Sequence, residues 1–145
     1  MGLQIGGLGL ERIRLGIIYK TLTVIGRRGK ARLQVLFDSG ATRSLLEASV
    51  ARRLADPVEL PEPETYSLAR GTMVVREGAF LQVVLNRRRI PVEARVVEGL
   101  SESLILGADF LQIWDIRLRP KKKQVLLDLR ALRLKAVSIS RDGLR

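Results

Sequence analysis

The stretch VLFDSGATRSLL, residues Val35–Leu46, raises the question on which the interpretation of this sequence depends. Three apolar residues lead directly into Asp38, so a carboxylate stands at the end of what the pattern predicts to be a buried strand. A buried charge without partners is costly. Asp38 is therefore either satisfied by nearby N–H groups in an Asx turn or used for chemistry, and the rest of the chain has to separate these alternatives.

The composition narrows the chemistry that is open to the chain. Its 145 residues are enough for one domain, and it contains neither cysteine nor histidine. Catalytic triads, Cys-His pairs and histidine-ligated zinc sites are thereby excluded, which leaves carboxylates, lysines, hydroxyls or an oxygen-bound metal. No apolar run reaches the roughly 20 residues of a membrane span, and the N-terminus lacks the pattern of a signal peptide. We therefore expect a cytoplasmic protein with no membrane partner.

Charge is distributed unevenly along the chain, whose formal net charge is +11. Residues 1–37 carry a net charge of +6, residues 38–116 a net charge of −3, and residues 117–145 a net charge of +8. The basic ends suit an anionic partner such as nucleic acid. They also suit solvent-facing and edge strands that are protected by charge. The second interpretation is favoured, because only 4% of the residues are aromatic and basic clusters without aromatics are poor platforms for bases.

The apolar pattern predicts a single, mainly β domain without internal repeats. Alternating apolar residues recur in five segments separated by glycine-containing or polar turns: Gly16–Gly26, Ala31–Phe37, Thr72–Leu85, Arg89–Val97 and Ser103–Leu106. A hairpin is expected over residues 115–129, with Pro120–Lys123 at its tip, and a last strand over Ala131–Ile139.

Helix signals are few. One helix is predicted within Ser44–Pro57, because Ser44 and Glu47 have the spacing of a capping box and Pro57 ends the apolar periodicity. Ala108–Trp114 is long enough for two further turns of helix. The segment Leu60–Glu64 contains two prolines and is predicted to be a loop.

A second motif strengthens the first. Sixty-six residues after Asp38, the apolar run that starts at Leu104 ends in Gly107 and leads into the predicted short helix. An apolar strand, Asp-Ser-Gly-Ala, a hairpin and an apolar-apolar-Gly segment, in this order, resemble the retropepsin-like aspartic proteases over about residues 17–129. The resemblance implies a single-domain closed β-barrel with one or two short helices, extended at both ends by basic segments. It also implies a two-fold homodimer, since one chain supplies only one Asp-Ser-Gly.

The resemblance further implies a protease mechanism. The two Asp38 carboxylates of a homodimer would share one proton and activate a water molecule that cleaves an extended polypeptide. No metal and no cofactor is required. Ser39 would form a hydrogen bond across the dimer, and Gly40 would present its N–H to the carboxylate.

The remaining roles also follow from the resemblance, position by position. Substrate contacts are expected from two residues after the motif and from the tip of a hairpin flap centred on residues 67–73: Ala41, Thr42, Ala69, Arg70 and Gly71. Leu106 and Gly107 would form the ψ-shaped loop that packs behind Asp38. Phe110 and Trp114 are expected to belong to the core rather than to a substrate pocket.

Two positions depart from the retroviral pattern. Retroviral members follow the motif with an acidic residue that holds the substrate backbone, where this chain has Thr42 and Arg43. They also carry arginine directly after the ψ-loop glycine, where this chain has Ala108. These differences leave the aspartate pair intact and affect substrate preference and dimer architecture.

A non-catalytic role stays open at this point. A dimer with the same fold could bind nucleic acid or a protein through its basic termini. The intact Asp-Ser-Gly favours catalysis, whereas the terminal charge favours an anionic partner, and the two roles do not exclude each other.

Overall fold

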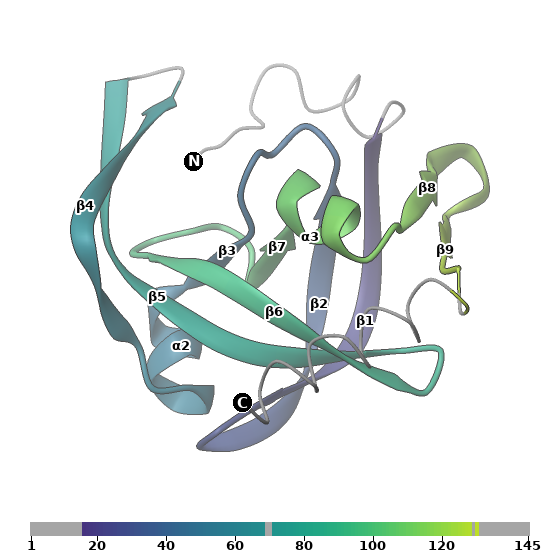
Figure 1. The fold of residues 1–145 in the computed structure, drawn as a ribbon, viewed down its shortest axis with the longest axis horizontal. Coiled ribbons are helices and arrows are strands. Elements are labelled where there is room, and N and C mark those ends of the chain that lie inside the picture. The colour runs from purple at the N-terminus through teal and green to yellow at the C-terminus, as the bar shows by residue number, and fades with distance from the viewer. Residues whose placement is uncertain (1–15, 69–70, 129, 131–145) are drawn as a thin grey trace.

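The computed structural model describes residues 16–68, 71–128 and 130 of the 145-residue chain. In this part, nine strands and two α-helices form a mainly β fold (Figure 1). The strands are β1 (Ile17–Gly26), β2 (Gly29–Asp38), β3 (Leu45–Glu47), β4 (Val58–Leu68), β5 (Gly71–Leu85), β6 (Arg88–Val97), β7 (Leu104–Leu106), β8 (Arg117–Arg119) and β9 (Gln124–Leu126). The helices are α2 (Ala48–Leu54) and α3 (Ala108–Ile113), and Pro120–Lys122 forms a 3-10 turn. The long strands confirm the predicted β segments to within two residues.

Six of the strands close into a barrel. The sheet order is β1-β2-β7-β3-β6-β5-β4, and an additional pairing of β1 with β5 joins the two sides. Val24 lies opposite Val83 in that closing pair. Strand β4 stays outside the barrel and pairs with β5, so that the two form a long hairpin that stands away from the barrel body (Figure 1). The predicted closed β-barrel is confirmed.

The barrel interior holds the main hydrophobic core. Inward-facing residues of β1, β2, β5 and β6 alternate with exposed ones, as expected for strands with one buried face. The two helices add their apolar faces to the same cluster. Phe110 and Trp114 are both only 3% exposed, and the Trp114 indole N–H donates to the Pro91 carbonyl at 3.1 Å. Both residues therefore belong to the core, as predicted.

The predicted helix over Ser44–Pro57 is wrong in its first turn. Leu45–Glu47 is strand β3, which lies between β6 and β7 and pairs with both. Helix α2 starts only after Glu47, whose side chain accepts a hydrogen bond from the Ser49 N–H at 2.8 Å. Ser44 is therefore no helix cap, and the capping-box interpretation fails because two neighbouring strands compete for the same backbone groups.

The predicted loop Leu60–Glu64 is part of strand β4. The pairing of β4 with β5 shifts register between Glu59 and Glu64, the stretch that contains Pro61 and Pro63. Proline is tolerated at this place because β4 is an edge strand, where a missing N–H interrupts no ladder on the outer side. The prolines mark an irregularity within the strand and not its end.

The C-terminal hairpin is confirmed where the structure describes it. Strands β8 and β9 pair antiparallel around the 3-10 turn, and Lys123 adopts the left-handed conformation that closes the turn. The predicted strand Ala131–Ile139 lies outside the described residues. Among the described residues, no helix is long and apolar enough to cross a membrane.

Candidate active site

Asp38 is the last residue of strand β2 and lies at the end of the barrel. The side chain is buried, with 4% of the residue exposed, and Asp38 is the last residue to pair with β1. The Gly40 N–H donates to the Asp38 carboxylate at 2.8 Å, and the Ala41 N–H donates to the Asp38 carbonyl at 3.1 Å. The turn after β2 thus folds back on the aspartate, and the Gly40 N–H reaches its carboxylate.

The residue after Asp38 is held from the N-terminal side. The Ser39 N–H donates to the Gly16 carbonyl at 3.0 Å, and the Ser39 hydroxyl lies 3.5 Å from the same oxygen. A Cβ at Gly16 would lie 2.2 Å from the Ser39 hydroxyl oxygen, so a larger residue there would force the hydroxyl to turn away. Ser39 and Gly40 are both exposed at the surface of the turn.

The second motif lies directly beside the first. Strand β7 pairs in parallel with β2, which places Leu106 opposite Phe37. Gly107 follows immediately, and a Cβ there would lie 2.6 Å from the Ala41 carbonyl oxygen and 2.8 Å from that of Arg43. The Ala108 N–H donates to the Ala41 carbonyl at 2.7 Å. The loop from Asp38 to Ser44, called the Asp38 loop below, therefore packs against Gly107. This close contact is possible only because Gly107 has no side chain.

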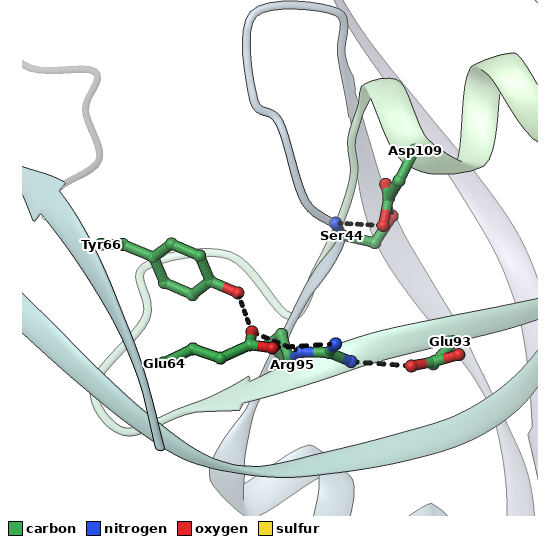
Figure 2. A network of polar contacts seen from close by, with 6 residues as sticks. All are labelled: Ser44, Glu64, Tyr66, Glu93, Arg95 and Asp109. Carbon is green, nitrogen blue, oxygen red and sulfur yellow. Dashed lines mark hydrogen bonds and ion pairs between the residues drawn. The ribbon is translucent and has the colours of Figure 1, made fainter. Parts of the chain in front are cut away.

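A buried serine fastens these two segments. Ser44 is fully buried, its hydroxyl donates to the Asp109 carboxylate at 2.8 Å, and its N–H donates to the same carboxylate at 3.1 Å (Figure 2). The Gly107 N–H in turn donates to the Ser44 hydroxyl oxygen at 3.1 Å. The sequence pattern favours Ser44 as a helix cap, and only the fold shows that it links the two segments.

The flap corresponds to the β4–β5 hairpin. Gly71 starts β5 with a positive φ of 127°, and a Cβ at this position would meet nothing within 4 Å. Ala69 and Arg70, the other predicted tip residues, lie outside the described residues. Thr42 and Arg43 are exposed on the Asp38 loop, and Ala41 is half-buried. The predicted substrate-binding residues that the structure describes thus belong to two elements, the Asp38 loop and the hairpin.

A network of charged side chains at the base of the flap was not anticipated. Arg95 of β6 is 8% exposed, and its guanidinium donates to the Glu64 carboxylate of β4 at 2.8 and 3.3 Å and to Glu93 at 2.8 Å (Figure 2). The Tyr66 hydroxyl donates to Glu64 as well. Hydrogen bonds from Arg95, and then from Tyr66, lower the pKa of Glu64 to about 2. The same contact with Glu64 raises the pKa of Arg95.

Two tyrosines near the site have altered acidity. Burial, and then the hydrogen bond with Glu64, raises the pKa of the Tyr66 hydroxyl. Burial also raises the pKa of Tyr19, and the charges of Glu102 and Asp38 add to this effect. Glu102 accepts a hydrogen bond from the Tyr19 hydroxyl at 3.2 Å. Both hydroxyls therefore act as neutral hydrogen-bond donors. Within residues 16–68, 71–128 and 130, no three acidic side chains lie close enough together to hold a metal ion.

Comparison with known proteins adds to this geometry. A family model described as "gag-polyprotein putative aspartyl protease" matches residues 26–113, which include both motifs and the hairpin. No curated protein matches the sequence. Among solved structures, the retroviral protease-like domain of Ddi1 from Leishmania major is 22% identical, with a TM-score of 0.53, and the match covers 77% of this chain and 84% of that one. EIAV protease complexed with the inhibitor HBY-793 is 20% identical, with a TM-score of 0.54, and the match covers 70% and 90% of the two chains. These similarities show the fold.

Proposed function

Since this chain belongs to the retropepsin-like aspartic proteases, we propose that it is an endopeptidase that works as a homodimer. The observation that carries the proposal is the position of Asp38 at the end of β2, in a turn that is bonded to the Gly107 segment. One chain contributes one such aspartate. A two-fold axis through the turn would bring two Asp38 carboxylates together, because an isologous interface places the same residue on both sides.

The chemistry follows from two carboxylates at close range. Both cannot ionise, so they hold one proton between them. The ionised carboxylate takes a proton from water as its oxygen attacks the scissile carbonyl, and the protonated one donates to the oxygen that becomes negative. Gly40 would hold the ionised carboxylate in place through its N–H, and Ser39 would bond across the dimer. No metal or covalent intermediate is needed.

A second, buried hydrophobic cluster joins the Asp38 loop to the hairpin, the two elements between which a substrate would lie. This cluster lies on β1, β2, β3, β5, β6 and β7, outside the barrel core: Ile17, Leu36, Leu45, Val75, Val97 and Ile105. Ala41 of the Asp38 loop and Met73 of the hairpin are partly buried against it. We infer that an extended polypeptide lies between the loop and the flap, and that peptide bonds between apolar residues are cleaved.

The test compares the parent chain with an Asp38→Asn variant on an unfolded protein substrate from acid to neutral pH. Asparagine keeps the size of the side chain and removes both the negative charge and the shared proton. We expect cleavage by the parent, strongest in acid, and a loss of at least about three orders of magnitude in kcat/KM in the variant. Equal cleavage by both chains would contradict the proposal.

A second candidate function rests on the charge of the C-terminal segment. The hairpin of β8 and β9 presents five exposed basic side chains: Arg117, Arg119, Lys121, Lys122 and Lys123. A dimer that binds nucleic acid through this segment would be retained on RNA or DNA in a salt-sensitive manner. Retention by both the parent and the Asp38→Asn variant, with no cleavage by either, would favour this function.

A further inference from the structure

The base of the flap is attached unevenly to the barrel. Strand β5 continues from the hairpin into the barrel and pairs with β6 over eight residue pairs. Strand β4 is an edge strand, and its pairing with β5 is irregular between Glu59 and Glu64. Pro61 and Pro63 supply no N–H donors in this stretch. The β4 side of the flap therefore needs another attachment, and side chains provide it.

Arg95 makes that attachment. Its guanidinium binds both oxygens of Glu64, the residue at which the regular pairing of the hairpin starts, and holds Glu93 with its remaining end (Figure 2). An arginine that binds a carboxylate through two N–H groups fixes orientation as well as distance. The Arg95 side chain is 10% exposed and that of Glu64 is 32% exposed, so the guanidinium is shielded from solvent while the carboxylate is partly exposed.

The same residue is bonded to the Asp38 loop. The Arg95 backbone N–H donates to the Ser44 carbonyl at 2.9 Å. The Ser44 hydroxyl accepts a hydrogen bond from the Gly107 N–H and donates one to the Asp109 carboxylate. Through its backbone and its side chain, Arg95 thus connects the loop that carries Asp38 to the strand that carries the flap.

A glycine in the intervening strand leaves room for this connection. Gly78 of β5 lies opposite Arg95 in the ladder, between β4 and β6. A Cβ at Gly78 would lie 3.6 Å from the Arg95 guanidinium, 3.5 Å from the Ala94 carbonyl oxygen and 3.4 Å from the Leu60 side chain. A single methyl fits at these distances, whereas a branched side chain would displace the guanidinium. The passage of Arg95 over β5 to reach Glu64 therefore depends on a small residue at position 78.

We propose that Arg95 is the positioning residue of the flap, which it holds against the barrel through Glu64 and Tyr66. This inference rests on the proposed protease function. Tyr66 extends the contact toward the flap tip, because its hydroxyl bonds Glu64 while its ring packs against the second hydrophobic cluster. Loss of Arg95 would leave the catalytic step at Asp38 unchanged and would weaken the binding of substrate by the flap.

The contacts of Arg95 with Glu64, and of Glu64 with Tyr66, are called the tether below. Amide hydrogen exchange tests the tether without requiring catalysis. We compare the parent, Arg95→Met and a control, Arg52→Met, which removes the exposed Arg52–Glu98 ion pair on α2. In Arg95→Met we expect exchange over residues 64–68 and 71–75 to rise at least about tenfold, with β1 and β2 unchanged and the control like the parent. Unchanged exchange in the hairpin, or an equal rise throughout the barrel, would overturn the proposal.

Two milder variants keep the test decisive should Arg95→Met fail to fold. Tyr66→Phe removes only the hydroxyl that bonds Glu64, and Glu64→Gln leaves Arg95 with its Glu93 partner. Both are expected to raise hairpin exchange by smaller factors, in the order Tyr66→Phe, Glu64→Gln, Arg95→Met. No effect from Glu64→Gln would overturn the tether.

Steady-state kinetics then test the consequence for the substrate. We expect Arg95→Met to raise KM about fivefold to tenfold while kcat changes by less than about twofold, and Arg95→Lys to restore part of the loss. A parent that cleaves nothing would refute the proposed function, and the exchange data would still decide the tether. A parent that cleaves, together with an Arg95→Met variant of unchanged KM, would overturn the positioning role.

Discussion

Among the single residues of the candidate site, Ser44 joins two segments that are far apart in the sequence. Its hydroxyl accepts from Gly107 and donates to Asp109, so one oxygen atom joins the Asp38 loop to the ψ-shaped segment. A serine was suited to this place because a hydroxyl both donates and accepts. The geometry of the aspartate therefore depends on a contact between residues 63 positions apart.

Replacement of this serine should be costly. Ser44→Ala leaves the buried Gly107 N–H without its acceptor, and a buried unsatisfied donor costs about 1–3 kcal/mol. We expect the free energy of unfolding in a denaturant titration to fall by about this amount. The control is Ser101→Ala at an exposed serine, which should change it by less than about 0.5 kcal/mol. An equal effect of the two substitutions would refute the assigned role of Ser44.

Gly107 gives a second prediction at this scale. Gly107→Ala places a methyl 2.6 Å from the Ala41 carbonyl oxygen, so the Asp38 loop has to move. We expect a loss of stability of about 1–3 kcal/mol, because overpacking a tight site forces the backbone to shift. Gly29→Ala serves as the control, since its Cβ would meet only the Leu54 side chain at 3.9 Å. If both variants melted like the parent, the close approach of the two segments would be wrong.

Among the elements, strand β4 is joined to strand β6 by the ion pair of Glu64 and Arg95, which stays ionised in acid. The lowered pKa of Glu64, about 2 against 4.5 for a free glutamate, means that the folded protein favours the ionised form. The stabilisation is therefore complete above pH 4.5 and is lost as the pH falls through about 2. The proposed aspartate pair would need acid conditions to share a proton, and the ion pair between Glu64 and Arg95 persists in most of that range.

The titration of Glu64 can be followed directly. By ¹³C NMR of the side-chain carboxyl in the Asp38→Asn variant, which prevents self-cleavage, we expect a midpoint near pH 2. Adding Arg95→Met should move the midpoint toward 4.5, because the largest cause of the lowered pKa is the Arg95 hydrogen bond. Arg52→Met should leave it unchanged. A midpoint near 4.5 with Arg95 present would contradict the ion pair.

The elements also separate what local sequence can predict from what it cannot. Alternating apolar residues indicate long strands such as β2 and β5, because alternate side chains of each are buried where the strand belongs to the barrel. Strand β3 was missed because three residues are too few for a periodic pattern, and its partners β6 and β7 lie about 50 and 60 residues further along. The prolines of β4 favour a loop locally, and only its place at the sheet edge permits a strand.

Some features of the candidate site can likewise be predicted from local sequence, and others cannot. The Asp-Ser-Gly and Leu-Gly motifs are local signals, and their order along the chain predicts the family and the barrel. The bonds from Ser44 to Asp109 and from Arg95 to Glu64 join residues 65 and 31 positions apart. Such pairs depend on strand order and register, which a single sequence does not display.

For the whole molecule, the proposed protease mechanism requires two chains. Asp38 is placed at the end of one barrel, and the proposed chemistry needs a second carboxylate within hydrogen-bonding distance of the same water. Dilution of the protein should therefore reduce the activity per chain as dimers dissociate. Sedimentation and activity measured over the same concentration range should change together, whereas constant activity per chain in a monomeric sample would argue against the dimer.

Subunit mixing shows whether two Asp38 residues form one active site. Parent and Asp38→Asn chains are combined in equal amounts at a fixed total concentration and left to exchange subunits. If two Asp38 residues form one active site, only dimers of two parent chains cleave, and the activity falls to about one quarter of that of the parent alone. Activity that stays near one half would mean that each chain works by itself with a single Asp38, which would contradict the account.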